Sequence, residues 1–236
     1  MFDGIAARYD FLNHLLSAGI DRRWRMRAIR ALALTGRETV LDVCTGTADL
    51  AIAAADSPAA GARQVIGVDF AGEMLRVGLV KVRRRRRGAP IALVRGDATR
   101  LPLADGSVNA VTIGFGIRNV DDTRAACEEL SRVLATDGRL AILEFAIPTA
   151  PVIRPLYLWY FRRVLPLIGR AISRDRAAYG YLPASVGSFA TPDEFVKILR
   201  QSGFEQVSAV PLTLGIVFLY TARRTSVGDH GRTRRH

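Results

Sequence analysis

The feature that most constrains the fold is an alternation of short apolar runs with helix-length segments between residues 39 and 144. Strands separated by helices in this way favour a parallel sheet with helices on both faces. The chain has 236 residues, 49% of them apolar, which suffices for one α/β core. We expect strands at Thr39–Val43, Gln64–Val68, Ile91–Arg95, Ala110–Ile113 and Arg139–Glu144, and helices at Ala48–Ala55, Ala71–Arg85 and Asp122–Leu134.

Both ends of the chain depart from this alternation. Residues 1–34 read as two helices, and after Pro148 a long apolar and aromatic stretch interrupts the pattern. The sequence predicts a single domain over residues 1–224, followed by a basic tail at 225–236 that we expect to be disordered. The later part of the domain should hold a helix at Pro192–Ser202 and apolar runs at Gln206–Pro211 and Gly215–Thr221.

The charge and the cysteines restrict the functional classes. The net charge is +12, but nearly all basic residues are arginine, beside many alanines and glycines, which indicates a codon bias and weakens a nucleic-acid interpretation. Cys44 and Cys127 have no metal-like spacing, so neither a disulfide framework nor a metal site is expected. The first residues do not resemble a signal peptide, and no apolar run reaches the ~20 residues that span a bilayer. A cytoplasmic protein is therefore expected.

The stretch VLDVCTGTADL, at residues 40–50, reads as a strand, a tight turn and the start of a helix. A dinucleotide site would require several glycines, so that backbone amides approach a pyrophosphate. Here Gly46 stands alone, and Asp42 at the end of the strand would repel a phosphate. A cationic or zwitterionic ligand suits this turn better.

Two further carboxylates follow the next two strands. Asp69 is placed to accept the hydroxyls of a ribose, and Asp97, followed by Ala98, is placed to accept from an adenine amino group. Each aspartate taken singly is equally consistent with a helix cap. Three carboxylates at three strand ends, without a phosphate cradle, favour S-adenosylmethionine over a nicotinamide dinucleotide.

With these residues identified, the sequence resembles the ubiquinone/menaquinone biosynthesis C-methyltransferase family from about Met1 to Ala222. The resemblance rests on MFDGIAARYDFLNHLLSAGIDRRWR, LDVCTGTADL, GVDFAGEML, GDATRLPLADGSVNAVTIGFGIRNV and GRLAILEF. It implies a Rossmann-like class I methyltransferase fold, with a seven-stranded, mostly parallel sheet whose last strand is antiparallel. It also implies cofactor contacts at Thr47, Asp69, Asp97 and Ala98, beside Asp42 and Gly46.

Two departures from the family pattern concern the cofactor side. Many relatives have glycine at the position of Ala48, and we interpret alanine there as tolerated. Some relatives use a serine at the position of Gly114, and that contact cannot be carried over.

The reaction that the resemblance implies is methylation of a ring carbon of a polyprenyl quinol, without a metal. The ring carbon becomes nucleophilic when a neighbouring hydroxyl, with an ordinary pKa of ~10, loses its proton. Arg118 and Asn119 follow the fourth strand, where a guanidinium could stabilise the phenolate. Alternatively, Arg118 pairs with a carboxylate and orders its loop. Tyr9, on an N-terminal helix that lids the site in related folds, is a candidate to hydrogen-bond the quinol or to pack in the core.

The apolar and arginine-rich stretch at residues 152–172 suits a hydrophobic substrate. Its aromatic residues with flanking arginines favour a helical insertion at residues 150–190 that contacts the isoprenoid tail or the inner face of the cell membrane. The alternative is a core helix or the interface of a homodimer.

Two functional questions stay open at this stage. The acceptor is either a demethylmenaquinol, which the segment DVCTGTAD favours, or a 2-methoxy-6-polyprenyl-1,4-benzoquinol, or both. A basic nucleic-acid-binding protein or a nucleic-acid methyltransferase is the rival class. A nucleic-acid methyltransferase is disfavoured for two reasons. The chain lacks an Asn/Asp-Pro-Pro-aromatic motif, and neither cysteine follows a proline after the fourth strand.

Overall fold

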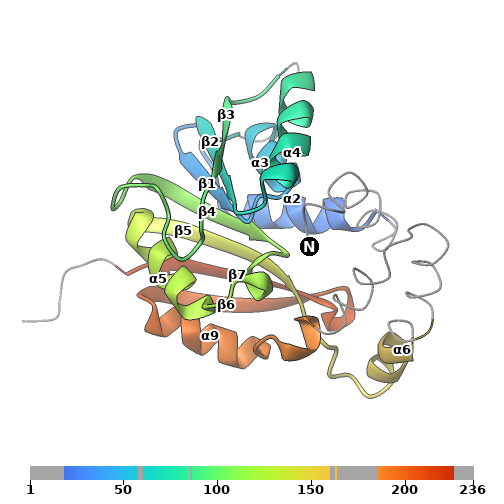
Figure 1. Cartoon of the computed structure of the whole chain (residues 1–236). Helices are drawn as coiled ribbons and strands as arrows, with labels where there is room; N and C mark the ends of the chain where they lie inside the picture. Colours follow the sequence, from blue (N-terminus) through green and yellow to red (C-terminus); the bar gives the residue numbers. More distant parts are fainter. Residues whose placement is uncertain (1–18, 58–60, 86, 160–162, 164–184, 226–236) are drawn as a thin grey trace, which may run out of the picture.

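The computed structural model describes residues 19–57, 61–85, 87–159, 163 and 185–225. Within these ranges the strands form one seven-stranded sheet in the order β3-β2-β1-β4-β5-β7-β6 (Figure 1). The strands β1 to β5 run parallel, and β7 runs antiparallel to both of its neighbours. The predicted fold class is therefore confirmed. The strands are β1 Thr39–Val43, β2 Gln64–Asp69, β3 Ile91–Arg95, β4 Val108–Gly114, β5 Leu134–Phe145, β6 Phe204–Leu212 and β7 Val217–Arg224.

Helices cover both faces of this sheet (Figure 1). The helices α5 and α9 pack on one face, and α2 and α3 pack on the other, where α4 contacts β2 and β3. Strand β1 is buried on both faces because Leu41 and Val43 join the first cluster while Val40 joins the second. The helices are α2 Asp21–Ala31, α3 Asp49–Ala55, α4 Gly72–Arg84, α5 Thr123–Val133, α6 Ile153–Trp159 and α9 Pro192–Gln201, with short 3₁₀ turns η2 Ile117–Asn119 and η4 Thr213–Gly215.

The predicted elements lie where the sequence places them, and the largest difference of extent is in β5. Strand β5 begins at Leu134, earlier than expected, because Leu134 already pairs with Val108 before the ladder resumes at Arg139. The intervening Asp137 has a left-handed backbone, with φ of 59°. The Asp137–Gly138 pair reads as a turn in sequence, but here it forms an irregularity within a strand.

Several predicted segments lie wholly or partly outside the described residues. These are the first part of the N-terminal lid with Tyr9, most of the 150–190 insertion, and nearly all of the basic tail. Within the described ranges, no helix has the length and apolar character needed to cross a membrane.

Candidate functional site

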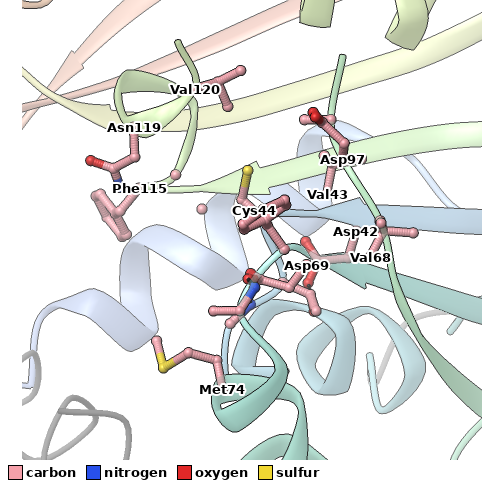
Figure 2. Close-up of a pocket in the computed structure, with 18 of the residues that line it drawn as sticks. Asp42, Val43, Cys44, Val68, Asp69, Met74, Asp97, Phe115, Asn119 and Val120 are labelled. Atoms are coloured by element: carbon pink, nitrogen blue, oxygen red, sulfur yellow. Dashed lines mark hydrogen bonds between the residues drawn. The ribbon is translucent and has the colours of Figure 1, made fainter. Parts of the chain in front are cut away.

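The site lies where the strand order reverses. From β1 the chain adds β2 and β3 on one side, and β4 then returns to pair with the other side of β1. Loops leave the carboxyl ends of β1 and β4 in opposite directions and open a crevice between them. A cavity of about 650 Å³ lies there, lined by the loops after β1, β2, β3 and β4 and by α2. In the view of Figure 2, Asp69 and Met74 lie below Cys44, and Phe115 and Asn119 lie to its left.

The turn after β1 has an unusual backbone. Cys44, Gly46 and Ala48 all have positive φ, of 53°, 55° and 68°, so this short turn repeatedly enters the left-handed region. A non-glycine residue pays about 1–2 kcal/mol for such a conformation, and backbone strain of this kind clusters at ligand sites. The left-handed backbone of Ala48 is one that glycine adopts at no steric cost.

Asp69 holds the turn in place. Its Oδ2 accepts the backbone N–H of Gly46 at 2.7 Å, and its Oδ1 accepts that of Ala71 at 2.8 Å. One carboxylate therefore joins the turn after β1 to the residue that caps α4. Asp69 is half-buried and lines the cavity, and its ribose contact stays a prediction.

Asp42 lies beneath the turn and is almost fully buried. Its Oδ2 accepts a hydrogen bond from the Thr45 hydroxyl at 2.6 Å, and its Oδ1 accepts one from the Thr112 hydroxyl at 2.8 Å. Burial raises the pKa of Asp42 to about 6, although the two hydroxyls act in the opposite direction. A positive charge in the cavity would favour the ionised form of Asp42.

The other predicted cofactor residues also line the cavity, but their side chains have different surroundings. Asp97 is exposed and accepts from both the backbone N–H and the hydroxyl of Thr99 at 2.8 Å, which lowers its pKa. Ala98 is buried. The buried Thr47 hydroxyl accepts from Lys81 Nζ at 2.9 Å.

Arg118 forms a buried ion pair, and its catalytic role stays a prediction. Its Nη1 lies 2.7 Å from Oε1 of Glu144, and the two side chains are 4% and 0% exposed. The guanidinium also donates to the carbonyl of Phe115 and to Ser185, and it lies over the ring of Phe145. Arg118 is not among the cavity-lining residues, whereas Asn119 is. The pairing of Arg118 with a carboxylate agrees with the alternative interpretation given above.

Several cavity-lining residues were missed from sequence, among them Arg25, Asp49 and Phe70. Arg25 on α2 and Asp49 at the start of α3 form an ion pair at 3.4 Å, and Phe70 is 70% exposed directly after Asp69. The place of Phe70 could have been predicted, because it directly follows an aspartate at a strand end. The approach of α2 to α3 could not have been, because only the tertiary fold brings them together.

The charges around the cavity are strongly unequal. Arg25 is the one basic residue among the described residues that line it. The surplus of carboxylates favours a ligand with positive charge and disfavours phosphates. The acidic residues lining the cavity are Asp42, Asp49, Asp69, Asp97, Asp121 and Asp122.

Comparison with known proteins agrees with this chemistry. Residues 1–224 match the ubiE/COQ5 methyltransferase family. The ubiquinone/menaquinone biosynthesis C-methyltransferase UbiE of Syntrophotalea carbinolica is 48% identical over 230 residues, which cover 97% of this chain and 94% of that protein. The demethylmenaquinone methyltransferase of Bacteroides fragilis is 40% identical over 224 residues, covering 95% and 91%.

Solved structures show the same fold at low identity. The SAM-dependent methyltransferase of Aquifex aeolicus superposes with a TM-score of 0.60 at 18% identity, covering 85% of this chain and 89% of that chain. This similarity concerns the fold alone, since one fold hosts many activities.

Proposed function

Because the chain belongs to the ubiE/COQ5 methyltransferase family and is a SAM-dependent C-methyltransferase of quinone biosynthesis, we propose that its acceptor is demethylmenaquinol, which it converts to menaquinol. The observation that carries the cofactor side is the group of aspartates around one cavity at the switch point of the sheet. The segment DVCTGTAD and the relative named demethylmenaquinone methyltransferase support the naphthoquinol. A 2-methoxy-6-polyprenyl-1,4-benzoquinol is the alternative, and the family argues against the nucleic-acid rival.

The proposed reaction is a displacement at the methyl carbon. One quinol hydroxyl loses its proton, and the adjacent ring carbon attacks the methyl group along the axis of the breaking sulfur–carbon bond. The sulfonium leaves as neutral S-adenosylhomocysteine. The methylated ring carbon then loses its proton, which makes the ring aromatic again. The ring oxygen that had been deprotonated regains a proton, so one proton is released overall.

On the cofactor side, we assign the ribose hydroxyls to Asp69 and the adenine edge to Asp97 and Ala98. Asp42 lies beneath the turn of Gly46 and Thr47, where its charge favours the cationic part of the cofactor. The cavity is of the size that a ligand such as S-adenosylmethionine requires.

On the acceptor side, Asn119 lines the cavity and is our candidate to contact the quinol. Arg118 becomes a positioning residue, because Glu144 neutralises it while it holds the carbonyl of Phe115. Tyr9 stays a candidate from sequence alone.

The 150–190 segment remains our candidate for the membrane-facing part of the molecule. In α6, Leu156 and Trp159 are 61% and 57% exposed, and Val152 just before it is 80% exposed. Exposed apolar and aromatic side chains beside Arg154 suit an interface with lipid. We therefore propose a cytoplasmic protein in peripheral contact with the inner face of the cell membrane.

The acceptor is tested by the quinones of a strain that lacks this protein. If the proposal is correct, extracts accumulate demethylmenaquinone, and the intact gene restores menaquinone. Accumulation of the benzoquinone precursor with normal menaquinone would identify the alternative acceptor.

The buried Asp42 leads to a prediction about pH. A sulfonium favours the ionised carboxylate, so binding should release a proton below the pKa of about 6 of Asp42. Affinity for S-adenosylmethionine should then fall as the pH drops through about 6 and level off above it.

S-Adenosylhomocysteine provides the control for this prediction, because its sulfur is neutral. The ratio of the two affinities, measured by calorimetry across this range, cancels the titration of groups that face both ligands. Asp42→Asn should make the ratio independent of pH. A ratio that already lacks pH dependence in the unaltered protein would contradict the assignment of Asp42.

A further inference from the structure

Arg25 is the feature of the cavity that the roles assigned so far do not use. It lies on α2, and its side chain is 11% exposed. Of the two carboxylates that it pairs with, Asp49 lines the cavity and Asp21 does not. S-Adenosylmethionine carries one negative group, the carboxylate of its methionine part. Among the described residues that line the cavity, Arg25 is the only cation available to it.

The guanidinium is held in a way that leaves one edge for a ligand. Its Nη1 pairs with Oδ2 of Asp21 at 2.5 Å and lies 3.4 Å from Oδ2 of Asp49. No described residue engages Nε or Nη2. These two donors form the planar fork that binds a carboxylate through two parallel hydrogen bonds.

Asp49 has a second cationic partner besides Arg25. Asp49 Oδ1 accepts from Lys81 Nζ at 2.6 Å, a shorter contact than the one to Arg25. A ligand carboxylate on Arg25 would therefore leave Asp49 paired with Lys81. An additional negative group can therefore bind to Arg25 without leaving Asp49 without a cationic partner.

Helix α2 also fixes the direction of Arg25. The adjacent Trp24 packs edge-on against Phe115 and Phe145 and donates from Nε1 to the Thr213 hydroxyl at 2.9 Å. The helix is thus anchored to the loop after β4 and to the turn before β7. A side chain that is held by an anchored helix loses little conformational entropy when it binds a ligand.

We propose that Arg25 binds the α-carboxylate of S-adenosylmethionine and so sets specificity for the amino-acid end of the cofactor. The inference rests on the cofactor-binding site proposed above. It adds a cofactor contact from α2, the helix that precedes the parallel sheet in the chain. Removing the contact should weaken the affinity for S-adenosylmethionine by about 10- to 100-fold, the range for a charged hydrogen-bonding partner.

The test varies the ligand as well as the protein. Calorimetry would compare S-adenosylmethionine, decarboxylated S-adenosylmethionine and methylthioadenosine, which lacks the whole amino-acid end. Arg25→Met keeps the aliphatic stem but removes the fork, and Arg27→Met is the matched control because Arg27 is exposed on the same helix. We expect Arg25→Met to weaken only S-adenosylmethionine, and Arg27→Met to change none of the three.

The outcomes distinguish a failure of this inference from a failure of the proposed cofactor-binding site. Equal weakening of all three ligands by Arg25→Met would show a structural role and overturn the inference. Unchanged affinity for S-adenosylmethionine would also overturn it. If the unaltered protein binds neither S-adenosylmethionine nor methylthioadenosine, the assignment of the cavity as the cofactor-binding site is wrong, and this inference is wrong as well.

A second variant covers a folding defect in Arg25→Met. Arg25→Lys keeps the positive charge but not the planar fork, so it should show a smaller loss that is again confined to S-adenosylmethionine. A loss shared with methylthioadenosine would contradict the proposal.

Discussion

Replacing Arg118 by alanine is expected to lower the free energy of unfolding by about 3–5 kcal/mol, the cost of leaving a buried charge without its partner. Glu144 is fully buried, and its Oε1 accepts from both Arg118 Nη1 and the backbone N–H of Phe145. Without the guanidinium the carboxylate keeps a backbone partner but loses its counter-charge. Denaturant unfolding of the purified variant measures the loss.

A double variant separates this positioning role from direct catalysis. Arg118→Met with Glu144→Gln removes both charges, so the free energy of unfolding should recover most of what Arg118→Ala loses. If Arg118 acts through the loop, methyl-transfer turnover should recover together with stability. A double variant that folds normally, remains about 100-fold slower and is rescued by high pH would instead show that Arg118 stabilises the phenolate.

Asp69→Ala is expected to weaken S-adenosylmethionine binding by about 100-fold, equivalent to about 3 kcal/mol. The substitution removes the proposed ribose contact and also the acceptor for the N–H groups of Gly46 and Ala71. Asp69→Asn should be nearly as damaging, because its amide NH₂ would face one of these two N–H donors. Calorimetry with S-adenosylmethionine measures both variants.

The ligand comparison again gives the control. S-Adenosylhomocysteine should lose affinity by the same factor, because Asp69 is assigned to the ribose that both ligands share. Glu128→Ala removes an exposed carboxylate on α5 that pairs with Arg124 outside the cavity, and it should leave both affinities unchanged. Unchanged affinity in a folded Asp69→Ala variant would remove Asp69 from the site.

The sheet and the grouping of Asp42, Asp69 and Asp97 around one cavity were predictable from the sequence, because both depend on local pattern. The strands β1, β2 and β3 are short apolar runs, and Asp42, Asp69 and Asp97 follow from their places at or next to the strand ends. Parallel strands bring their carboxyl ends to one edge of the sheet, so linear position translates directly into proximity.

The acceptor side was less predictable because its contacts are non-local. Arg118 occupies the predicted loop after β4, but its direction depends on Glu144 in β5 and Ser185 far along the chain. The pairing of Arg25 with Asp49 likewise depends on how α2 packs against α3. Residue type and strand position do not determine which way such a side chain points.

The most direct test of the proposed function follows a labelled methyl group. Purified protein would be incubated with S-adenosylmethionine labelled in its methyl group and with equal amounts of reduced demethylmenaquinone and reduced 2-methoxy-6-polyprenyl-1,4-benzoquinone. The account predicts that the label appears on a ring carbon of the naphthoquinol, faster than on the benzoquinol, with one S-adenosylhomocysteine formed per methyl group transferred. Label on the benzoquinol alone, on a quinol oxygen, or on neither acceptor would contradict it.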